Sequence, residues 1–180
     1  VSAAIHVAAE LKLADLIAAG QQTSAALAQQ TQTHPQAMYR LLRTLASVGL
    51  FTEVEPGSFE LTALGMLLKS DHPMSMRALT RYTCSHMQWQ RFGALRRAVE
   101  TGGSVDREVL GMRGREYRNH HPEARETMNE AMVSLVRQVV DAVVRAYDFS
   151  RFQTLVDVGG GYGALLSAIL TRTPQLRAVL

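Results

Sequence analysis

Residues 155–163 read LVDVGGGYG, and this stretch decides the fold class. A short apolar run that ends at glycines is typical of a strand buried in a parallel sheet. Residues 164–170 continue as a helix that Pro174 stops, and residues 176–180 begin a second apolar run. Strand, glycine turn, helix and strand in this order predict the truncated start of an α/β, Rossmann-like domain over residues 151–180.

The glycine turn is suited to a nucleoside-bearing ligand. Glycines allow positive φ and a close approach of ligand to backbone, and the helix that follows presents free N–H groups. Two motifs fit the residues. Gly159, Gly161 and Ala164 satisfy the dinucleotide form G-x-G-x-x-A. Asp157 and Gly163 extend the same glycines to D-x-G-x-G-x-G, the motif of Rossmann-like methyltransferases.

The acid at position 157 separates these two motifs. A carboxylate ahead of the first glycine is unhelpful beside a pyrophosphate but useful near the sulfonium and ammonium groups of S-adenosylmethionine. A P-loop is excluded because the Gly-Lys-Ser/Thr ending is missing. We therefore predict a site for S-adenosylmethionine, formed by Asp157, Gly159, Gly160, Gly161 and Gly163.

The first 65 residues predict helices followed by a hairpin. Thr23 or Ser24 caps the second helix, Pro35 opens the third, and Thr62 caps the helix after the hairpin. The predicted helices span residues 3–19, 24–30 and 35–48, and the predicted strands span 51–54 and 59–61. Three helices and a hairpin in this order form the outline of a winged helix, by analogy of topology.

The middle of the chain is predicted to be helical. We expect a helix over residues 73–101, an irregular stretch over 104–113, a short helix over 115–120 and a long helix over 122–146. The first and last of these carry apolar stripes, made of Trp89, Phe92, Leu95 and Val99 and of Ala124, Met128, Met132, Leu135, Val139 and Val143.

The chain resembles the small-molecule O-methyltransferases, which include plant caffeate-type enzymes and bacterial enzymes that methylate polyketides and other aromatic metabolites. Residues 155–163 look like the first cofactor motif of that family. Other stretches are similar to family segments in the same order, namely residues 8–16, 41–51, 61–65, 121–132 and 146–150.

The resemblance implies a division of the chain and a function. It implies a winged-helix-like dimerisation domain over residues 1–101, linking helices over 102–150, and the truncated start of the S-adenosylmethionine-binding domain over 151–180. The expected activity is transfer of a methyl group to a hydroxyl of a small aromatic acceptor, in a homodimer. Met128, Asn129 and Met132 match family positions that face the acceptor. The catalytic base, a histidine in this family, is expected downstream of Leu180, so the 180-residue piece alone is expected to be inactive.

The composition and the cysteine count indicate the class of protein and its cellular compartment. The chain is 47% hydrophobic and 19% charged with a net charge of +3, which fits a folded domain. One cysteine, Cys84, permits no internal disulfide, and we expect a cytoplasmic protein with no membrane partner. No apolar run approaches the roughly 20 residues of a membrane helix, and we expect no signal peptide, because no basic stretch followed by an apolar one opens the sequence. The six histidines are scattered without metal-ligand spacing, so no metal site is predicted.

Two other function classes stay open on the residues alone. A DNA-binding regulator would use residues 36–48 as its recognition helix, but this helix offers only Arg40 and Arg43, and the hairpin is acidic. We therefore expect no nucleic-acid partner. An NAD(P)-dependent oxidoreductase would use the same glycine turn, and cofactor titration would distinguish it from a methyltransferase.

Overall fold

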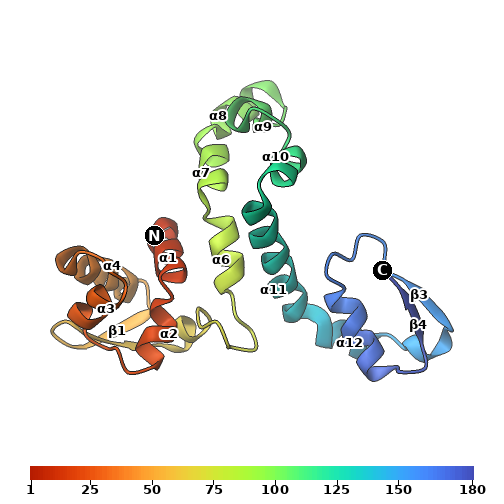
Figure 1. Cartoon of the computed structure of the whole chain (residues 1–180), viewed down its shortest axis with the longest axis horizontal. Helices are drawn as coiled ribbons and strands as arrows, with labels where there is room; N and C mark the ends of the chain where they lie inside the picture. The colour runs from red at the N-terminus through yellow and green to blue at the C-terminus, as the bar shows by residue number, and fades with distance from the viewer.

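The computed structural model describes residues 1–180 as two compact ends joined by a helical arch (Figure 1). The N-terminal end holds five helices and a hairpin. Helices α6, α7, α10 and α11 form the two sides of the arch, and α8 and α9 lie at its tip. The C-terminal end holds α12 and the parallel strands β3 and β4. The chain is mostly helical, as predicted.

The elements have the following bounds. The N-terminal end comprises α1 (Ser2–Glu10), α2 (Leu13–Ala18), α3 (Ser24–Gln30), α4 (Pro35–Ser47), β1 (Phe51–Glu55), β2 (Ser58–Leu61) and α5 (Ala63–Met66). The arch comprises α6 (Arg77–Thr83), α7 (His86–Gly93), α8 (Leu95–Thr101), α9 (Asp106–Leu110), α10 (Gly114–His120) and α11 (Pro122–Ala146). After the 3-10 turn Phe149–Arg151 come β3 (Thr154–Val156), α12 (Ala164–Arg172) and β4 (Arg177–Val179).

Local signals place the N-terminal elements where they were predicted. The Thr23 hydroxyl accepts a hydrogen bond from the N–H of Ala26 at 3.2 Å and so caps α3. Pro35 occupies the first turn of α4. The Thr62 hydroxyl accepts from the N–H of Gly65 at 3.1 Å and caps α5. The hairpin pairs Phe51 with Leu61 in antiparallel register. The second and third predicted helices and the hairpin are therefore confirmed to within a residue or two.

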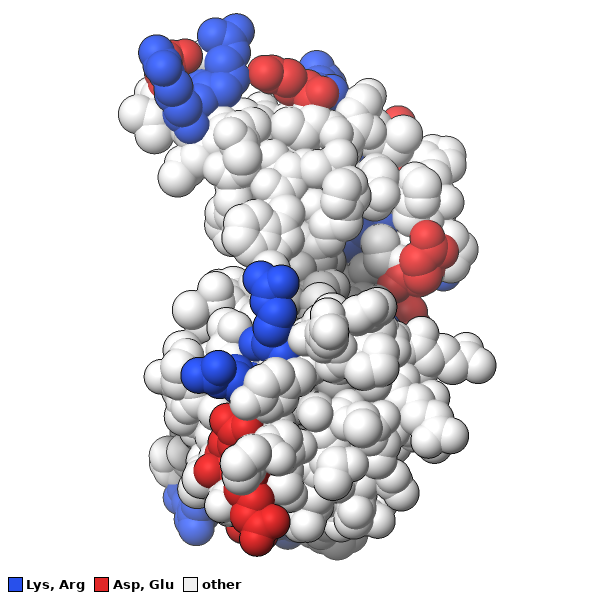
Figure 2. All heavy atoms as spheres, turned by 90° about the vertical axis from the view of Figure 1, so that its left-hand side faces the viewer, with Lys and Arg blue, Asp and Glu red and all other residues white.

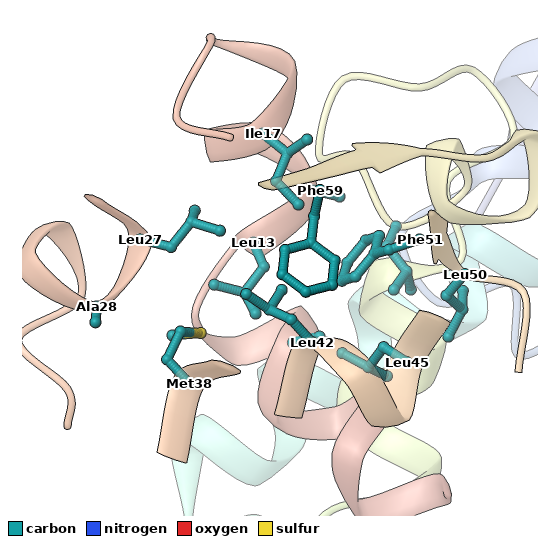
Figure 3. Packing of buried hydrophobic residues seen from close by; sticks show 13 residues of the cluster. Leu13, Ile17, Leu27, Ala28, Met38, Leu42, Leu45, Leu50, Phe51 and Phe59 are labelled. Atoms are coloured by element: carbon teal, nitrogen blue, oxygen red, sulfur yellow. The ribbon is translucent and has the colours of Figure 1, made fainter. Parts of the chain in front are cut away.

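The hydrophobic core lies between α2, α3, α4 and the hairpin. Figure 3 shows Phe51 and Phe59 side by side at its centre, with Leu13 and Leu42 against them. Both phenylalanines are almost fully buried, at 1% and 0% exposed. The hairpin thus closes the core that the helices leave open on one side.

The single helix predicted over residues 3–19 is wrong. Lys12 has φ of 53° and separates α1 from α2. This break turns α2 so that Leu13, Ala14 and Ile17 all enter the core. Burial of these side chains offsets the cost of a left-handed lysine, which is of order 1–3 kcal/mol.

The continuous helix predicted over residues 73–101 is also wrong, because the chain forms three separate helices there. The first begins at Arg77, and breaks follow at Ser85 and Ala94. The stretch 104–113, predicted to be irregular, contains α9. Two parallel hydrogen bonds of 2.7 and 3.0 Å from the Arg91 guanidinium to the Asp106 carboxylate hold α9 against α7. This contact joins residues fifteen apart, so helical periodicity could not reveal it.

The apolar stripe predicted for the arch is exposed along α7 and α8. Trp89, Phe92, Leu95 and Val99 are 47%, 60%, 59% and 77% exposed in the single chain. The stripe predicted for α11 is also largely uncovered, with Val139 at 53%. The buried residues of α11 are Ala131 and Ser134, and α11 packs against α6. Small residues at these positions allow the two helices to approach closely.

Candidate cofactor site

Strands β3 and β4 bring the glycine turn to one end of a parallel pair. Thr154, Leu155 and Val156 pair with residues 177–179. The N–H of Asp157 then donates to the carbonyl of Val179 at 2.9 Å, which is the last hydrogen bond before the turn. The predicted strand–turn–helix–strand unit is therefore confirmed, and the turn lies at the carboxyl end of β3. In α/β sheets this end is where ligands bind.

Three glycines of the turn adopt conformations that other residues avoid. Gly159, Gly161 and Gly163 have φ of 79°, 59° and 68°. Gly163 is also the N-cap of α12, and its N–H donates to the carbonyl of Gly160 at 2.9 Å. The turn is therefore closed by its own backbone, and the N-terminus of α12 opens beside it. Free N–H groups at such a helix end attract a carboxylate or other anion.

Gly160 is required for a different reason. A Cβ atom at this position would lie 2.1 Å from Oδ2 of Asp157. The carboxylate of Asp157 therefore lies directly over the bare backbone of the turn. It forms no hydrogen bond or ion pair within the chain, although the residue is only partly exposed. The predicted acid and glycines are thus brought together, with a free negative charge among them.

A contact that the sequence did not predict joins this turn to α11. The hydroxyl of Tyr162 donates to Oε2 of Glu126 at 2.5 Å. Arg172 of α12 also donates to Asp141 of α11 at 3.0 Å. Because these partners are 36 and 31 residues apart, no local pattern could have revealed them. Together they attach the C-terminal end to the long helix.

The three predicted acceptor residues lie on α11 but not in the cavity beside Tyr162. Met128 and Asn129 are half-buried, and Met132 is 40% exposed. A cavity of about 330 Å³ adjoins Tyr162, and from α11 it is lined by Glu130, Val133, Ser134 and Arg137. The acceptor assignment of Met128, Asn129 and Met132 therefore stays a prediction.

An acid followed by a glycine turn lies between two parallel strands and is attached to a helical module, which is the arrangement predicted for a methyltransferase with a separate helical domain. Comparisons with known proteins agree with this class. Residues 1–85 match the O-methyltransferase dimerisation domain, and residues 92–180 match the O-methyltransferase domain. The chain belongs to the O-methyltransferase family that these two domains define.

Relatives are similar to the chain over its whole length. A phenazine O-methyltransferase from Lysobacter antibioticus is 41% identical over 180 residues, which are 100% of this chain and 52% of the relative. The mitomycin biosynthesis 6-O-methyltransferase of Streptomyces lavendulae is 36% identical, covering 98% of this chain and 51% of the relative. The chain therefore spans about half the length of the curated relatives it matches.

Solved structures share the fold. The crystal structure of LaPhzM has a TM-score of 0.93 at 41% identity, covering 99% of this chain and 54% of that chain. An O-methyltransferase from neocarzinostatin biosynthesis, solved with S-adenosylmethionine and 2-hydroxy-5-methyl naphthoic acid, has a TM-score of 0.79 at 32% identity. The match covers 98% of this chain and 55% of that one.

These comparisons give no support to the regulator or the oxidoreductase. The charges on the surface likewise give no support to a DNA-binding regulator. Figure 2 looks at the side that carries the N-terminal end and shows separate basic and acidic groups on a largely uncharged face. Arg43 lies 3.9 Å from the Glu53 carboxylate, which offsets one of the two charges of the predicted recognition helix. No helix of the chain combines the length and apolar character needed to cross a membrane.

Proposed function

We propose that the protein is an S-adenosylmethionine-dependent methyltransferase that methylates a hydroxyl of a small aromatic molecule. The observation that carries the proposal is the unpaired carboxylate of Asp157 over the bare backbone of Gly160. A free negative charge there suits a cationic cofactor. The relatives support the acceptor class, because their names specify phenazine and mitomycin methylation.

The residues of the turn fit this cofactor. Asp157 would attract its positively charged methionine end, and the glycines would let that end lie against the chain. When bound, S-adenosylmethionine supplies an activated methyl group, so the protein has mainly to position and desolvate the reactants. Met128, Asn129 and Met132 remain our candidates for the acceptor side. The family resemblance puts the proton-accepting base beyond Leu180.

Substitution of Asp157 by Asn tests whether the negative charge of its carboxylate contributes to cofactor binding. In the full-length protein we expect Asp157→Asn to weaken S-adenosylmethionine binding about tenfold to a hundredfold, because an interaction with a charged group contributes roughly 1.5–3 kcal/mol. Isothermal titration calorimetry measures the change. Asp71→Asn makes the same charge change at an exposed carboxylate that pairs with Lys69 and should leave the affinity unchanged. Heat from a nicotinamide dinucleotide, with none from S-adenosylmethionine, would reject the proposal.

We further propose that the protein is a homodimer and that the exposed face of α7 and α8 contributes to its interface. A match to a dimerisation domain ends at residue 85, and this face begins immediately after it. Four large apolar side chains project there, and such patches usually mark interaction sites. A second copy would cover them.

Charges placed in this face should separate the subunits. We expect the double change Phe92→Glu and Leu95→Glu to raise the dimer dissociation constant about several hundredfold or more, since buried interface anchors contribute about 2 kcal/mol or more each. Light scattering after size exclusion reports the mass. Val54→Glu, at a residue 48% exposed on the hairpin, is the control and should leave the dimer intact. A double variant that stays dimeric at low concentration would exclude this face.

A further inference from the structure

The cavity beside Tyr162 lies between α6, α11 and the glycine turn. Its volume is about 330 Å³, at the small end of the range for ligand sites, which is roughly 300–1,000 Å³. Two arginines line it, Arg77 at the start of α6 and Arg137 on α11. Figure 1 shows these two helices side by side, and they make extensive contact. The proposed cofactor contacts of Asp157 and Gly160 do not include these arginines.

Most polar groups around this cavity are already used by the protein. Ser70 donates through both its N–H and its hydroxyl to the Asp15 carboxylate, at 2.8 and 2.9 Å. The Ser134 hydroxyl donates to the carbonyl of Ser75. The Glu130 carboxylate accepts from Arg81 at 3.3 Å. The hydrogen-bond donors that are free for a ligand therefore belong to the two arginines.

The two guanidinium groups keep unused donors. Arg77 donates through Nε to the carbonyl of Ala9 at 2.8 Å, which leaves both terminal nitrogens without an acceptor. Arg137 makes no hydrogen bond or ion pair in the chain, so all five of its N–H donors are free. Burial, followed by the neighbouring charge of Arg81, lowers the pKa of Arg77. The positive charge at this cavity is therefore only partly compensated.

The remaining walls are apolar or aromatic. Ala78 and Val133 line the cavity together with Tyr162, whose ring is held in place by the hydrogen bond to Glu126. A fork of N–H donors matches the two oxygens of a carboxylate, and these walls suit a flat ring. We propose that this cavity binds a small aromatic carboxylate, with its charged end on Arg77 and Arg137.

The test uses benzoate, together with its neutral analogue benzamide, and follows binding by ligand-observed NMR or calorimetry. We expect benzoate to bind at least tenfold more tightly than benzamide, and Arg137→Gln to lower benzoate affinity about tenfold. The control is Arg125→Gln on the same exposed helix, outside the cavity, which should change the affinity less than twofold. Arg77→Gln should match Arg137→Gln, and circular dichroism checks that it folds, because it also loses the contact with Ala9.

Three results would overturn the proposal. The first is equal affinity for benzoate and benzamide, and the second is unchanged benzoate affinity in Arg137→Gln. The third is inorganic phosphate binding as tightly as benzoate, which would mean that the cavity attracts any anion. The measurement needs no S-adenosylmethionine. A separate titration of the wild-type protein with S-adenosylmethionine tests the proposed function, so failure of one proposal is distinguishable from failure of the other.

Discussion

Gly160→Ala should weaken S-adenosylmethionine binding in the full-length protein about as much as Asp157→Asn does, by roughly tenfold to a hundredfold. The added methyl group would lie 2.1 Å from Oδ2 of Asp157, far inside any real contact distance. The carboxylate must then leave the turn, or the turn must change its backbone. Loss of the charged interaction with the cofactor costs roughly 1.5–3 kcal/mol. We therefore expect calorimetry to show an affinity about tenfold to a hundredfold lower.

A matched glycine and a double-mutant cycle give this prediction its controls. A Cβ atom at Gly93, the last residue of α7, would meet no atom within 4 Å, so Gly93→Ala should leave binding unchanged. In an Asp157→Ala background the clash disappears, and Gly160→Ala should then cost little more. Additive losses in the cycle would show that Gly160 acts independently of Asp157. Normal cofactor affinity in Gly160→Ala would refute the described geometry of the turn.

Phe59→Ala should remove about 3–5 kcal/mol from the free energy of unfolding, which is a large part of the stability of a typical domain. Phe59 is fully buried, and its ring lies against Tyr39 in an edge-on arrangement with centroids 6.2 Å apart. Truncation opens a cavity at the centre of the core, where the hairpin meets the helices (Figure 3). Urea unfolding followed by circular dichroism measures the loss.

The control for this prediction is a phenylalanine at the surface. Phe152 is 45% exposed and stacks only on Tyr147, so Phe152→Ala should cost about 1 kcal/mol or less. A loss below about 1 kcal/mol for Phe59→Ala would mean that the hairpin contributes little to the core. The helices alone would then have to bury Leu13 and Leu42.

Much of the fold could be predicted because its signals are local. The caps at Thr23 and Thr62 and the proline at the start of α4 each act within a few residues, so periodicity and side-chain chemistry reveal them. The same holds for the glycine turn, since Gly159 and Gly161 supply conformations that few other residues adopt. The predicted acid and glycines therefore meet in one place.

The sequence-based predictions of helices were wrong where contacts between distant residues override the local preference for helix or loop. Apolar spacing predicts an unbroken helix through Lys12, yet burial of Leu13 and Ile17 under the hairpin forces a break there. Residues 104–113 lack a helical pattern, and α9 forms because Asp106 is held by Arg91. The stripe from Trp89 to Val99 has the spacing of a buried face but remains exposed in one chain.

The amino-acid sequence alone determined the family, the order of helices and strands, and an acid beside a glycine turn, because each depends on neighbours along the chain. Only the tertiary structure decided which faces are covered, where the arch helices break, and that Tyr162 reaches Glu126. It also placed Arg77 and Arg137 around one cavity. Such contacts join residues 36 or more apart, and the path of the chain between them brings them together.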